Sequence, residues 1–479
     1  MSLAYSRPSQ TKIIATIGPS CDQPVILRQL ISSGVDVVRI NSAHSSVEDC
    51  ARKLTLIRAV AEELAQPVAV LLDLAGPKLR LGRLVGDQVY CRPEGVIRLI
   101  RGDTATQPDE LVSTYPSLVD EIGPGDRILL ADGTVELRVE EVKHGVAFCR
   151  VIQPGVVRSR QGINVIGVRV RVRALTPQDR EFAIWAAENA VDFVGLSFVR
   201  LPEEVNELKA LLQSRGSHAQ VVAKIEKVEA LERLDEIVQA ADVVMVARGD
   251  LGIEADIAEL GVLQKRIIRV CRQLGRPVIV ATQMLDSMQS QLMPTRAEVA
   301  DVANAIIDGA DACMLSGETA VGQHPVEAVS MMHRIALATE PFLTASYAEL
   351  PAREGTAGAE EITEAAAEAA VRLAVRLRAK CLVAGTARGH TALKLSRYRS
   401  GVPIVGVTDN PATWRRMCLY WGVIPLLGPK SPQPEGLLSY VLDWGKRRSI
   451  LAPGDIIVLL AGHGFSRGAQ NMIMIHQVD

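Results

Sequence analysis

Eight short apolar runs recur along this chain before residue 340. Each is continuously rich in Val, Ile, Leu and Ala, as in strands buried on both faces of a parallel sheet. Strands that alternate with helices predict an α/β fold, a (β/α)8 TIM barrel. The predicted strands are Lys12–Gly18, Asp36–Asn41, Val68–Asp73, Phe193–Phe198, Val221–Glu226, Val243–Arg248, Val278–Gln283 and Ala312–Gly317. The segments with helical spacing are Gln178–Ala190, Pro202–Ser214, Val228–Ala240, Glu259–Leu274, Ala297–Asp308 and Val326–Thr339.

One connection is far too long for a barrel loop. Leu74–Arg173 separates the third run from the fourth, and it is rich in Gly and β-branched residues. Polar and apolar residues alternate at Val135–Val139 and Val168–Arg173, as in half-buried strands. The sequence therefore predicts an all-β domain inserted after barrel strand 3, where it would act as a mobile lid.

A different pattern follows Thr339. Arg353–Glu361 is typical of a linker, and Ile362–Ala379 has helical periodicity. Strand-like runs then return at Cys381–Gly385, Ile404–Thr408, Val423–Leu427, Ile456–Ala461 and Met472–Gln477. We expect a separate C-terminal α/β domain. The predicted boundaries are 1–73 and 174–345 for the barrel, 74–173 for the lid, and 346–479 for the C-terminal domain.

Composition argues against several classes of protein. Lys and Arg total 53 against 55 Asp and Glu, and this balance argues against nonspecific nucleic-acid binding and a polybasic membrane contact. Aromatic residues are only 4%, too few for base-stacking platforms. The eight cysteines form no C-x-x-C pair, no apolar run approaches the ~18 residues of a membrane span, and residues 1–12 lack the apolar core of a secretory signal. We therefore expect a cytoplasmic protein with no nucleic-acid or membrane partner.

Charged and polar residues follow nearly every predicted barrel strand. The carboxyl ends of the strands meet at one face, where TIM-barrel chemistry takes place. One charged residue at a strand end is as readily half of an ion pair as part of an active site. Ion pairing explains the whole set less well, because charged residues are rarely buried without partners. The strand ends supply Gly18, Pro19, Arg39, Asn41, His44, Asp73, Lys78, Arg80, Ser197, Phe198, Lys224, Glu226, Arg248, Asp250, Thr282, Ser316 and Glu318.

These residue types suit phosphoryl transfer. Glu226 and Asp250 are oxygen donors on adjacent strands, and hard oxygen ligands suit Mg²⁺. Lys224 and Arg39 can neutralise a phosphoryl group in transit. Thr282 can carry or position a proton.

Backbone amides supply a second kind of anion contact. Gly249, in the segment Arg248–Gly252, lets the amides at a helix start approach an anion. The chain has no Walker A, zincin or α/β-hydrolase motif, and Gly462, Gly464 and Gly468 miss the dinucleotide-binding spacing by one residue. By motif, the chain is therefore not a P-loop enzyme, a Rossmann dehydrogenase, a zincin or an α/β-hydrolase.

An ordered set of motifs resembles the pyruvate kinase family over nearly the whole chain. They are Thr11–Pro19 (TKIIATIGP), Val222–Glu226 (VAKIE), Met245–Glu254 (MVARGDLGIE), Ala281–Met288 (ATQMLDSM), Pro294–Glu298 (PTRAE) and Asp301–Thr319 (DVANAIIDGADACMLSGET). The resemblance implies a glycolytic, allosteric enzyme that transfers the phosphoryl group of phosphoenolpyruvate to ADP, giving pyruvate and ATP. It also implies a barrel, a lid and a C-terminal effector domain in a homotetramer, with Mg²⁺, or Mn²⁺ in its place, as cofactor.

The family's roles carry over to matching positions. The resemblance implies that Arg39 and Lys224 bind the moving phosphoryl group, and that Thr282 lies beside the enolate carbon that is protonated. The other implied positions are the metal ligands Glu226 and Asp250, the substrate contacts Ala247, Arg248, Gly249 and Asp250, the nucleotide-side residues Asn41, His44 and Arg80, and the lid motif Asp132 and Gly133.

Two departures touch the family's monovalent-cation site. The family's N-F-S-H-G is NSAHS at Asn41–Ser45, and its D-T-K-G-P-E-I-R is DLAGPKLR at Asp73–Arg80. The serine ligand of K⁺ is thus Ala43, and a nearby acid is Lys78. A fixed ammonium would supply the charge of K⁺ and repel the ion, so we hypothesise that K⁺ is not required. In the alternative, Lys78 points to solvent and K⁺ binds through Asn41, Asp73 and the Leu74 carbonyl.

A third departure lies at the exit of the lid. Arg160-Gln161 stands where the family often has a basic pair, so one cation for the nucleotide phosphates is missing. Arg169, Arg171 and Arg173 alternate with valines, and we interpret them as a solvated strand face rather than an anion site.

The C-terminal domain carries a candidate effector loop. Gly385–Thr391 (GTARGHT) follows a predicted strand and precedes a helix, which suits a phosphate at a helix N-terminus. The family places a sugar-phosphate or nucleotide effector here, and the loop Gly462–Gly468 would face it or form a simple turn. The implied effector residues are Thr386, Arg388, His390 and Thr391.

Two other functions fit part of the pattern. Another phosphoenolpyruvate or pyruvate barrel, such as a mutase or aldolase, would also use Mg²⁺, but the inserted and C-terminal domains count against it. A non-catalytic metabolite sensor would lose the chemistry, whereas Lys224, Glu226, Asp250 and Thr282 are all present. A reaction without ADP would indicate the first alternative, and metabolite binding without turnover the second.

Overall fold

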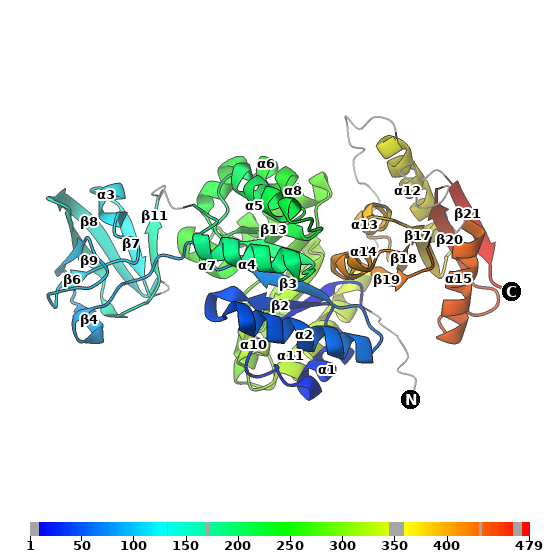
Figure 1. Cartoon of the computed structure of the whole chain (residues 1–479), viewed down its shortest axis with the longest axis horizontal. Helices are drawn as coiled ribbons and strands as arrows, with labels where there is room; N and C mark the ends of the chain where they lie inside the picture. Colours follow the sequence, from blue (N-terminus) through cyan, green and yellow to red (C-terminus); the bar gives the residue numbers. More distant parts are fainter. Residues whose placement is uncertain (1–8, 132, 168–172, 344–358, 431–433, 463–471) are drawn as a thin grey trace.

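Three bodies follow one another along the long axis of the molecule (Figure 1). The all-β insert lies at one end, the barrel in the middle and the C-terminal domain at the other end. The structure is a computed structural model, and it describes residues 9–131, 133–167, 173–343, 359–430, 434–462 and 472–479.

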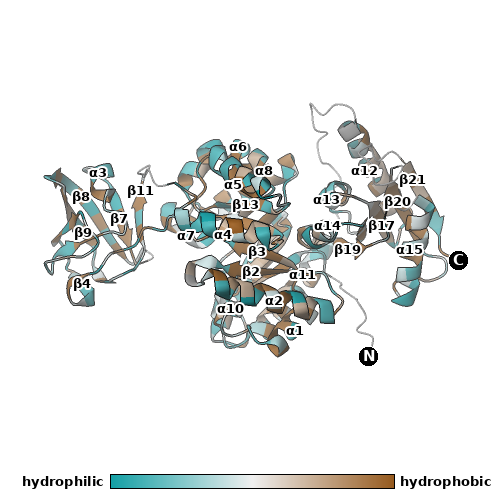
Figure 2. Cartoon of the chain, in the orientation of Figure 1, coloured by the Kyte–Doolittle hydropathy of each residue, from teal (hydrophilic) through white to brown (hydrophobic). Residues whose placement is uncertain are grey.

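The central body is a closed barrel of eight parallel strands, as predicted. Its order is β1-β16-β15-β14-β13-β12-β3-β2, so each barrel strand pairs with the next barrel strand along the chain, including β3 with β12 across the insert. The barrel interior is apolar and appears brown in Figure 2, with Leu71, Phe193 and Met245 each at most 1% exposed. The strands are β1 (Lys12–Thr16), β2 (Val37–Asn41), β3 (Ala69–Asp73), β12 (Phe193–Leu196), β13 (Gln220–Ile225), β14 (Val243–Ala247), β15 (Val278–Ala281) and β16 (Ala312–Leu315).

Helices cover the outside of the barrel. Thr176 with Asp179, and Thr295 with Glu298, form capping boxes that fix where two of these helices begin. The helices are α1 (Pro24–Ser32), α2 (Val47–Glu63), α4 (Pro177–Glu188), α5 (Pro202–Ser214), α6 (Leu234–Ala240), α8 (Leu260–Leu274), α9 (Arg296–Asp308) and α11 (Pro325–Thr339). The short helices α7 (Arg248–Glu254) and α10 (Gly317–Ala320) follow β14 and β16 directly.

One predicted helix is wrong in its first half. Residues 228–240 form a 3₁₀ segment, η3 (Val228–Arg233), followed by α6. The backbone leaves the helical region at Arg233, where φ is −121° and ψ is 32°. This break leaves both Leu231 and Leu234 buried, so packing overrides the regular helical spacing.

The insert is an all-β domain with its own core. Its strands form a six-stranded sheet, β11-β7-β8-β9-β5-β6, and a separate pair, β10-β4. Leu99, Leu137 and Cys149 belong to its apolar cluster, which is separate from that of the barrel. The elements are β4 (Gln88–Cys91), β5 (Val96–Ile100), β6 (Glu110–Leu111), α3 (Leu118–Glu121), β7 (Arg127–Leu130), β8 (Val135–Lys143), β9 (Val146–Gln153), β10 (Gly155–Arg158) and β11 (Ile163–Ile166). The strand predicted at Val168–Arg173, with Arg169 and Arg171, lies almost wholly outside the described residues.

The C-terminal domain is a five-stranded sheet in the order β19-β18-β17-β20-β21. The first four strands are parallel, and β21 runs antiparallel at the edge. Its strands are those predicted: β17 (Cys381–Gly385), β18 (Ile404–Thr408), β19 (Val423–Leu427), β20 (Ile456–Ala461) and β21 (Met472–Gln477). The helices are α12 (Ala359–Arg376), α13 (His390–Arg397), α14 (Pro411–Arg416) and α15 (Pro434–Arg447).

The C-terminal domain contacts the amino ends of the barrel strands. Lys12 Nζ, on the first residue of β1, donates to the Val423 carbonyl at 2.7 Å. Arg415 Nε donates at 2.7 Å to Asp192, which precedes β12. The domain therefore lies at the end of the barrel opposite the carboxyl ends of the strands. Among the described helices, none combines the length and apolar character that a membrane crossing needs.

Candidate active site

Asp73 is the centre of a buried ion-pair cluster at the carboxyl ends of the barrel strands. It is the last residue of β3 and is 1% exposed. Arg39 Nε donates to its Oδ2 at 2.8 Å, and Lys224 Nζ lies 3.2 Å from its Oδ1. Burial opposes ionisation of this carboxyl, but Lys224 and Arg39 outweigh burial and lower its pKa. The carboxylate is therefore charged and holds both cations in place.

Lys224 extends from β13 towards three side-chain oxygens. Besides Asp73, its Nζ lies 2.9 Å from Glu226 Oε1 and donates to Ser197 Oγ at 2.7 Å. Burial acts to lower the pKa of this ammonium, but Asp73 and Glu226 raise it above its usual value. Arg39 also donates to Thr16 Oγ1 at 3.2 Å. Both cations predicted to bind a phosphoryl group thus come together, charged and anchored.

The two predicted metal ligands repel each other electrostatically. Glu226 is 1% exposed, and burial raises the pKa of its carboxyl; Lys224 lowers it, and the charge of Asp250 raises it again. Within the described part of the chain, no three His, Cys, Asp or Glu side chains are grouped to hold a metal. Two hard carboxylates with mutual repulsion fit Mg²⁺, which takes its remaining ligands from water and substrate oxygens.

Lys78 meets the second of these carboxylates. Its Nζ lies 3.3 Å from Asp250 Oδ1, and its side chain is 34% exposed. Lys78 therefore does not point to solvent alone, because its ammonium pairs with a predicted metal ligand. Two of the atoms considered as K⁺ ligands have partners of their own. The Leu74 carbonyl accepts from Ser197 Oγ at 2.7 Å, and Asn41 Oδ1 accepts from the Ala43 amide at 3.1 Å.

Thr282 follows β15 with a strained backbone. Its φ is 68°, which is unusual for a β-branched residue and is found mainly at functional sites. Its Oγ1 donates to the Ala281 carbonyl at 2.6 Å and accepts from the Gly249 amide at 2.7 Å. We expected the Gly249 amide to be open to an anion, but the hydroxyl of Thr282 occupies it here.

The Arg248 side chain ties two loops together. It is 5% exposed, and its guanidinium donates to Asp301 Oδ2 at 2.6 Å and to the Thr282 carbonyl at 2.7 Å. These contacts occupy the Arg248 guanidinium, so this side chain holds the loops together rather than facing the ion-pair cluster.

The nucleotide-side residues are only partly brought to this cluster. Asn41 is opposite Asp73 in the β2–β3 register, so it lies beside the ion pairs. Arg80 NH1 donates to the Arg160 carbonyl of the lid at 3.1 Å, on the far side of the connector. His44 lies in a short 3₁₀ turn, and its side chain is outside the described part of the structure. Of the lid motif, Gly133 occupies a turn with φ of 86°, and Asp132 is not among the described residues.

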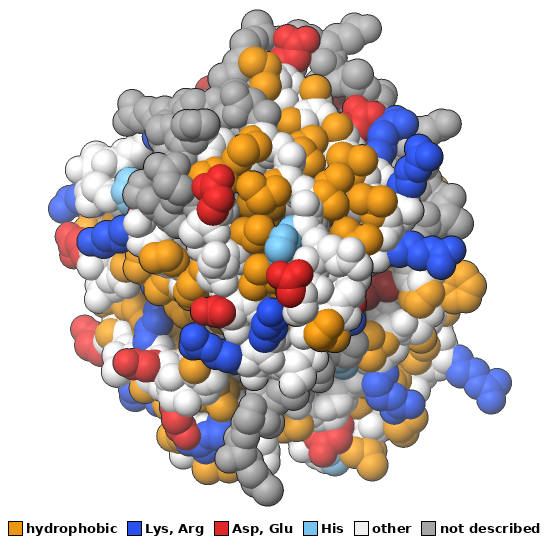
Figure 3. Space-filling view, turned by 90° about the vertical axis from the view of Figure 1, so that its right-hand side faces the viewer, with side chains coloured by type: hydrophobic (Ala, Val, Ile, Leu, Met, Phe, Trp, Pro, Cys, Tyr) orange, Lys and Arg blue, Asp and Glu red, His pale blue; other side chains and the backbone are white. Residues whose placement is uncertain are grey.

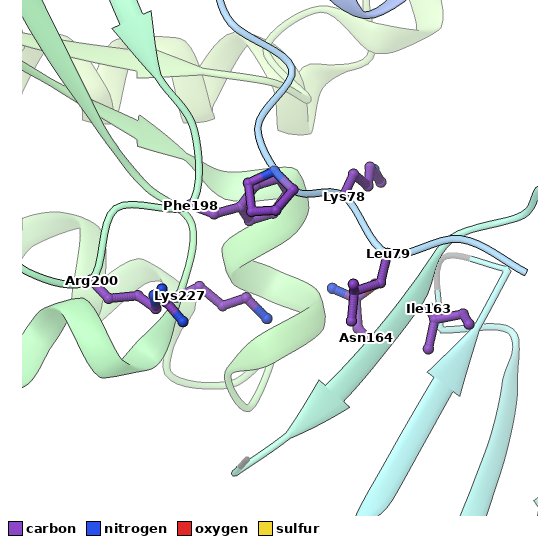
Figure 4. Close-up of a pocket in the computed structure, with 8 residues that line it drawn as sticks. Lys78, Leu79, Ile163, Asn164, Phe198, Arg200 and Lys227 are labelled. Carbon is purple, nitrogen blue, oxygen red and sulfur yellow. The ribbon is translucent and has the colours of Figure 1, made fainter. Parts of the chain in front are cut away.

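A pocket whose empty space, including the part open to solvent, is about 490 Å³ lies where the lid joins the barrel (Figure 4). Lys78 and Asn164 face it from the lid side, and Arg200 and Lys227 from the barrel side. Lys227 pairs with Glu254 of α7, whose Oε1 also accepts from Asn164 Nδ2 at 3.2 Å. This contact joins the lid to the barrel next to Asp250. The lining residues are Pro77, Lys78, Leu79, Ile163, Asn164, Phe198, Arg200 and Lys227.

One charged strand-end residue has a purely local role. Glu318 is 2% exposed, and its carboxylate accepts from the Leu285 amide at 3.1 Å and the Ser316 amide at 2.7 Å. The sequence placed Glu318 at the barrel mouth correctly, but its oxygens are used by the backbone of neighbouring loops.

Three residues that hold the charged side chains were given no role from the sequence. Ser197 Oγ accepts a hydrogen bond from the Lys224 ammonium, Thr16 Oγ1 accepts one from Arg39, and Asp301 Oδ2 accepts one from Arg248. Ser197 stands at a strand end, and Thr16 and Asp301 lie within the family motifs. No spacing rule distinguishes them from other polar residues there.

The predicted effector residues divide into buried and exposed pairs. Thr386 and Thr391 are 2% and 4% exposed, and the hydroxyl of Thr386 accepts from the Gly389 amide at 3.0 Å. Arg388 and His390 are exposed at the start of α13. The facing loop lies outside the described residues after Gly462.

Models of known protein families match both the barrel part and the C-terminal part of this chain. The family model "Pyruvate kinase, barrel domain" matches residues 8–329, and "Pyruvate kinase, alpha/beta domain" matches residues 364–476. The chain belongs to the pyruvate kinase family. The family predicted from the motifs, and with it an enzyme, is thereby confirmed.

Individual pyruvate kinases align over nearly the full length of this chain. The protein from Geobacillus stearothermophilus is 38% identical over 474 residues, which covers 98% of this chain and 80% of the relative. Pyruvate kinase 2 of Synechocystis is 40% identical over 465 residues, covering 95% of this chain and 77% of the relative. A crystal structure of a pyruvate kinase from Cryptosporidium parvum superposes with a TM-score of 0.92 at 31% identity, covering 98% of this chain and 97% of that one.

Proposed function

We propose that this chain transfers the phosphoryl group of phosphoenolpyruvate to ADP in glycolysis, giving pyruvate and ATP. The observation that supports this most strongly is the cluster of Arg39, Asp73, Lys224 and Glu226 at the carboxyl ends of the barrel strands. A lone pair of a β-phosphate oxygen of ADP attacks phosphorus. The bond from phosphorus to the enol oxygen breaks, its electron pair stays on that oxygen, and the enolate carbon then takes a proton.

Lys224 and Arg39 stabilise the negative charge on the transferring group. Both are held by Asp73, so they need no reorganisation when charge develops. Glu226 and Asp250 would hold Mg²⁺, or Mn²⁺ in its place, which supplies positive charge to substrate oxygens. In this proposal the amides of Ala247–Asp250 contact the substrate carboxylate, for which the Gly249 amide must first release the Thr282 hydroxyl. The Thr282 hydroxyl positions the proton for the enolate carbon. Asn41, His44 and Arg80 serve the nucleotide.

We propose that K⁺ is not required. The Lys78 ammonium lies beside Asp250 and brings a fixed positive charge to the mouth of the barrel. Ala43 offers no hydroxyl, and the Leu74 carbonyl already accepts from Ser197. A resident ammonium at this position disfavours a second monovalent cation through like-charge repulsion.

We propose a homotetramer in which the C-terminal domain supplies one interface. β21 is an edge strand, and Ile475 on it is 51% exposed. Ile362 and Val375 of α12 are 50% and 52% exposed, and hydrophobic side chains gather on this end of the molecule (Figure 3). An apolar patch beside an unpaired edge strand favours pairing with a second copy.

Two further proposals concern regulation and location. A sugar phosphate or nucleotide would bind the loop of Thr386, Arg388, His390 and Thr391, at the start of α13. A reducing, cytoplasmic location is supported by the eight cysteines, which are buried and form no disulfide among the described residues.

The test of the proposed reaction is pyruvate formation from phosphoenolpyruvate with Mg²⁺, with and without ADP. Turnover that needs ADP and yields ATP supports the proposal. Consumption of phosphoenolpyruvate without ADP would instead indicate a mutase- or aldolase-like barrel, and binding without turnover would indicate a sensor.

A further inference from the structure

A basic cavity lies between the barrel and the C-terminal domain, at the end of the barrel away from Lys224. The empty space between its lining residues, including the part open to solvent, is about 290 Å³. The barrel contributes the end of α8, the loop that follows it, and the residue before β16. The C-terminal domain contributes α13 and the turn beyond it. The lining residues are Arg272, Gly275, Arg276, Pro277, Asp311, Leu393, Arg397 and Arg399.

Four of these eight residues are arginines, two from each domain, and one is acidic. Both oxygens of the acidic residue, Asp311, have partners. Oδ1 accepts from Arg399 at 2.8 Å, and Oδ2 accepts from the Val278 amide at 2.8 Å. Outside the lining, Arg397 also lies 3.4 Å from Glu364. Guanidinium groups from two domains that share one space repel each other, and Asp311 and Glu364 offset part of this repulsion through Arg399 and Arg397.

The backbone makes room for two of these arginines. Gly275 has φ of +65°, and a Cβ there would lie 2.9 Å from Cζ of Arg397. Gly309 has φ of +104°, and a Cβ there would lie 2.7 Å from Cδ of Arg272. Side chains larger than glycine would therefore displace the arginines from the cavity wall.

The other two arginines are held by specific contacts. Arg399 stacks 4.6 Å from the ring centre of Trp421 and donates to the Gly309 carbonyl at 3.0 Å. Arg276 NH2 donates to the Gln239 carbonyl at 2.8 Å, while its Nε is buried and has no hydrogen-bond partner among the described residues. A buried donor without a partner costs stability unless a ligand or water satisfies it.

We propose that this cavity binds a phosphate-type oxyanion, either inorganic phosphate or the phosphoryl group of a phosphomonoester, and that the anion joins the two domains. Guanidinium groups match phosphate oxygens in charge and in the spacing of their donors. Because the ligand would touch Arg272 and Arg276 from the barrel and Arg397 and Arg399 from the C-terminal domain, its binding favours the docked arrangement.

This site goes beyond the proposed reaction and is separate from the predicted effector loop. The loop lies at the amino end of α13, at His390, whereas Arg397 is the last residue of that helix. The eight residues of α13 place the two ends about 12 Å apart. An anion in the cavity would therefore act at the domain interface.

Thermal unfolding of the full chain, titrated with inorganic phosphate against chloride at equal ionic strength, tests the proposal. Phosphate should raise the unfolding midpoint of the unmodified chain, since a ligand of the folded state stabilises it. Arg276→Gln and Arg397→Gln should each weaken phosphate binding about tenfold or more. The control Arg269→Gln, at an exposed position of α8, should keep the full rise.

Phosphate bound only at the catalytic site or the effector loop would instead raise the unfolding midpoints of Arg276→Gln and the unmodified chain by the same amount. An equal rise in Arg276→Gln and in the unmodified chain would overturn the proposal, as would no rise beyond that of chloride. Should Arg397→Gln fail to fold, Arg276→Lys decides, because it keeps the charge and should retain part of the effect. Glycerol 3-phosphate distinguishes the sources: a rise with both ligands assigns the site to phosphomonoesters, and a rise with inorganic phosphate alone assigns it to the free ion.

Discussion

The Lys78 ammonium lies 3.3 Å from the Asp250 carboxylate, across the junction between the lid connector and α7. This pair places a fixed positive charge beside the proposed metal ligands, at the mouth of the barrel. It also couples the connector that carries the lid to the helix that follows β14, so the same contact bears on cation dependence and on lid position.

Replacing Lys78 with Glu should create a K⁺ requirement. The variant loses the resident charge and regains the acid that the family has at this position. Turnover without K⁺ should fall by about 10²-fold, the scale of losing one preorganised electrostatic contact, and K⁺ should restore much of it. Initial rates with and without K⁺, at fixed ionic strength set by a large organic cation, measure this. Equal K⁺ responses in the variant and the unmodified chain would contradict the role given to Lys78.

Glu226→Gln should raise the Mg²⁺ concentration needed for half-maximal rate. An amide keeps the shape of the side chain but removes the charge that attracts a divalent cation. A Mg²⁺ titration of the initial rate checks this, with Glu232→Gln as a control on the 3₁₀ segment that follows. An unchanged titration in Glu226→Gln would remove it from the metal site.

Glu298 should stabilise the protein in a pH-dependent way. Burial opposes ionisation of this carboxyl, but hydrogen bonds from Ser287 and Thr295 outweigh it and hold its pKa below the usual range. A lowered folded-state pKa stabilises above the unfolded pKa, and this contribution is lost as pH falls through the folded value. Glu298→Gln should therefore cost about 1 kcal/mol at pH 7, the scale of a helix cap, and less in acid.

Unfolding midpoints of Glu298→Gln and the unmodified chain, recorded at pH 7 and near pH 4, measure this difference. The gap should narrow at the lower pH. A gap that is the same at both pH values would show that the carboxylate charge contributes nothing.

Ile475→Lys should weaken association through the C-terminal domain. A charge on the exposed face of β21 discourages edge-to-edge pairing. Light scattering after size exclusion should report a smaller species than for the unmodified chain, while Val262→Lys, at an exposed position of α8, should leave the mass unchanged. If neither variant loses assembly, this edge is excluded as an interface.

The sequence predicted the architecture well because the barrel strands are buried on both faces. Continuous apolar runs identify such strands directly, and the five C-terminal strands coincide with their predicted ranges. Residues 228–240 could not be predicted in the same way, since the break at Arg233 reflects packing of Leu231 and Leu234 rather than local spacing.

The sequence predicted which site residues lie at the ends of the barrel strands, but it did not predict which of them pair with each other. Asp73, Lys224 and Glu226 were expected at one face of the barrel, and they meet there. The partner of Lys78 depends on the path of the connector, which no local pattern encodes. The use of the Gly249 amide by Thr282 likewise depends on two loops meeting in space.

The most direct test of the account is the rate of pyruvate formation from phosphoenolpyruvate and ADP in Lys224→Met beside the unmodified chain. Lys224 is the cation that joins Asp73, Glu226 and Ser197, so its loss should remove charge stabilisation and lower turnover by about 10³-fold. An unfolding midpoint close to that of the unmodified chain would show that the variant is folded. Near-normal turnover in the folded variant would contradict the assignment of this cluster as the site of phosphoryl transfer.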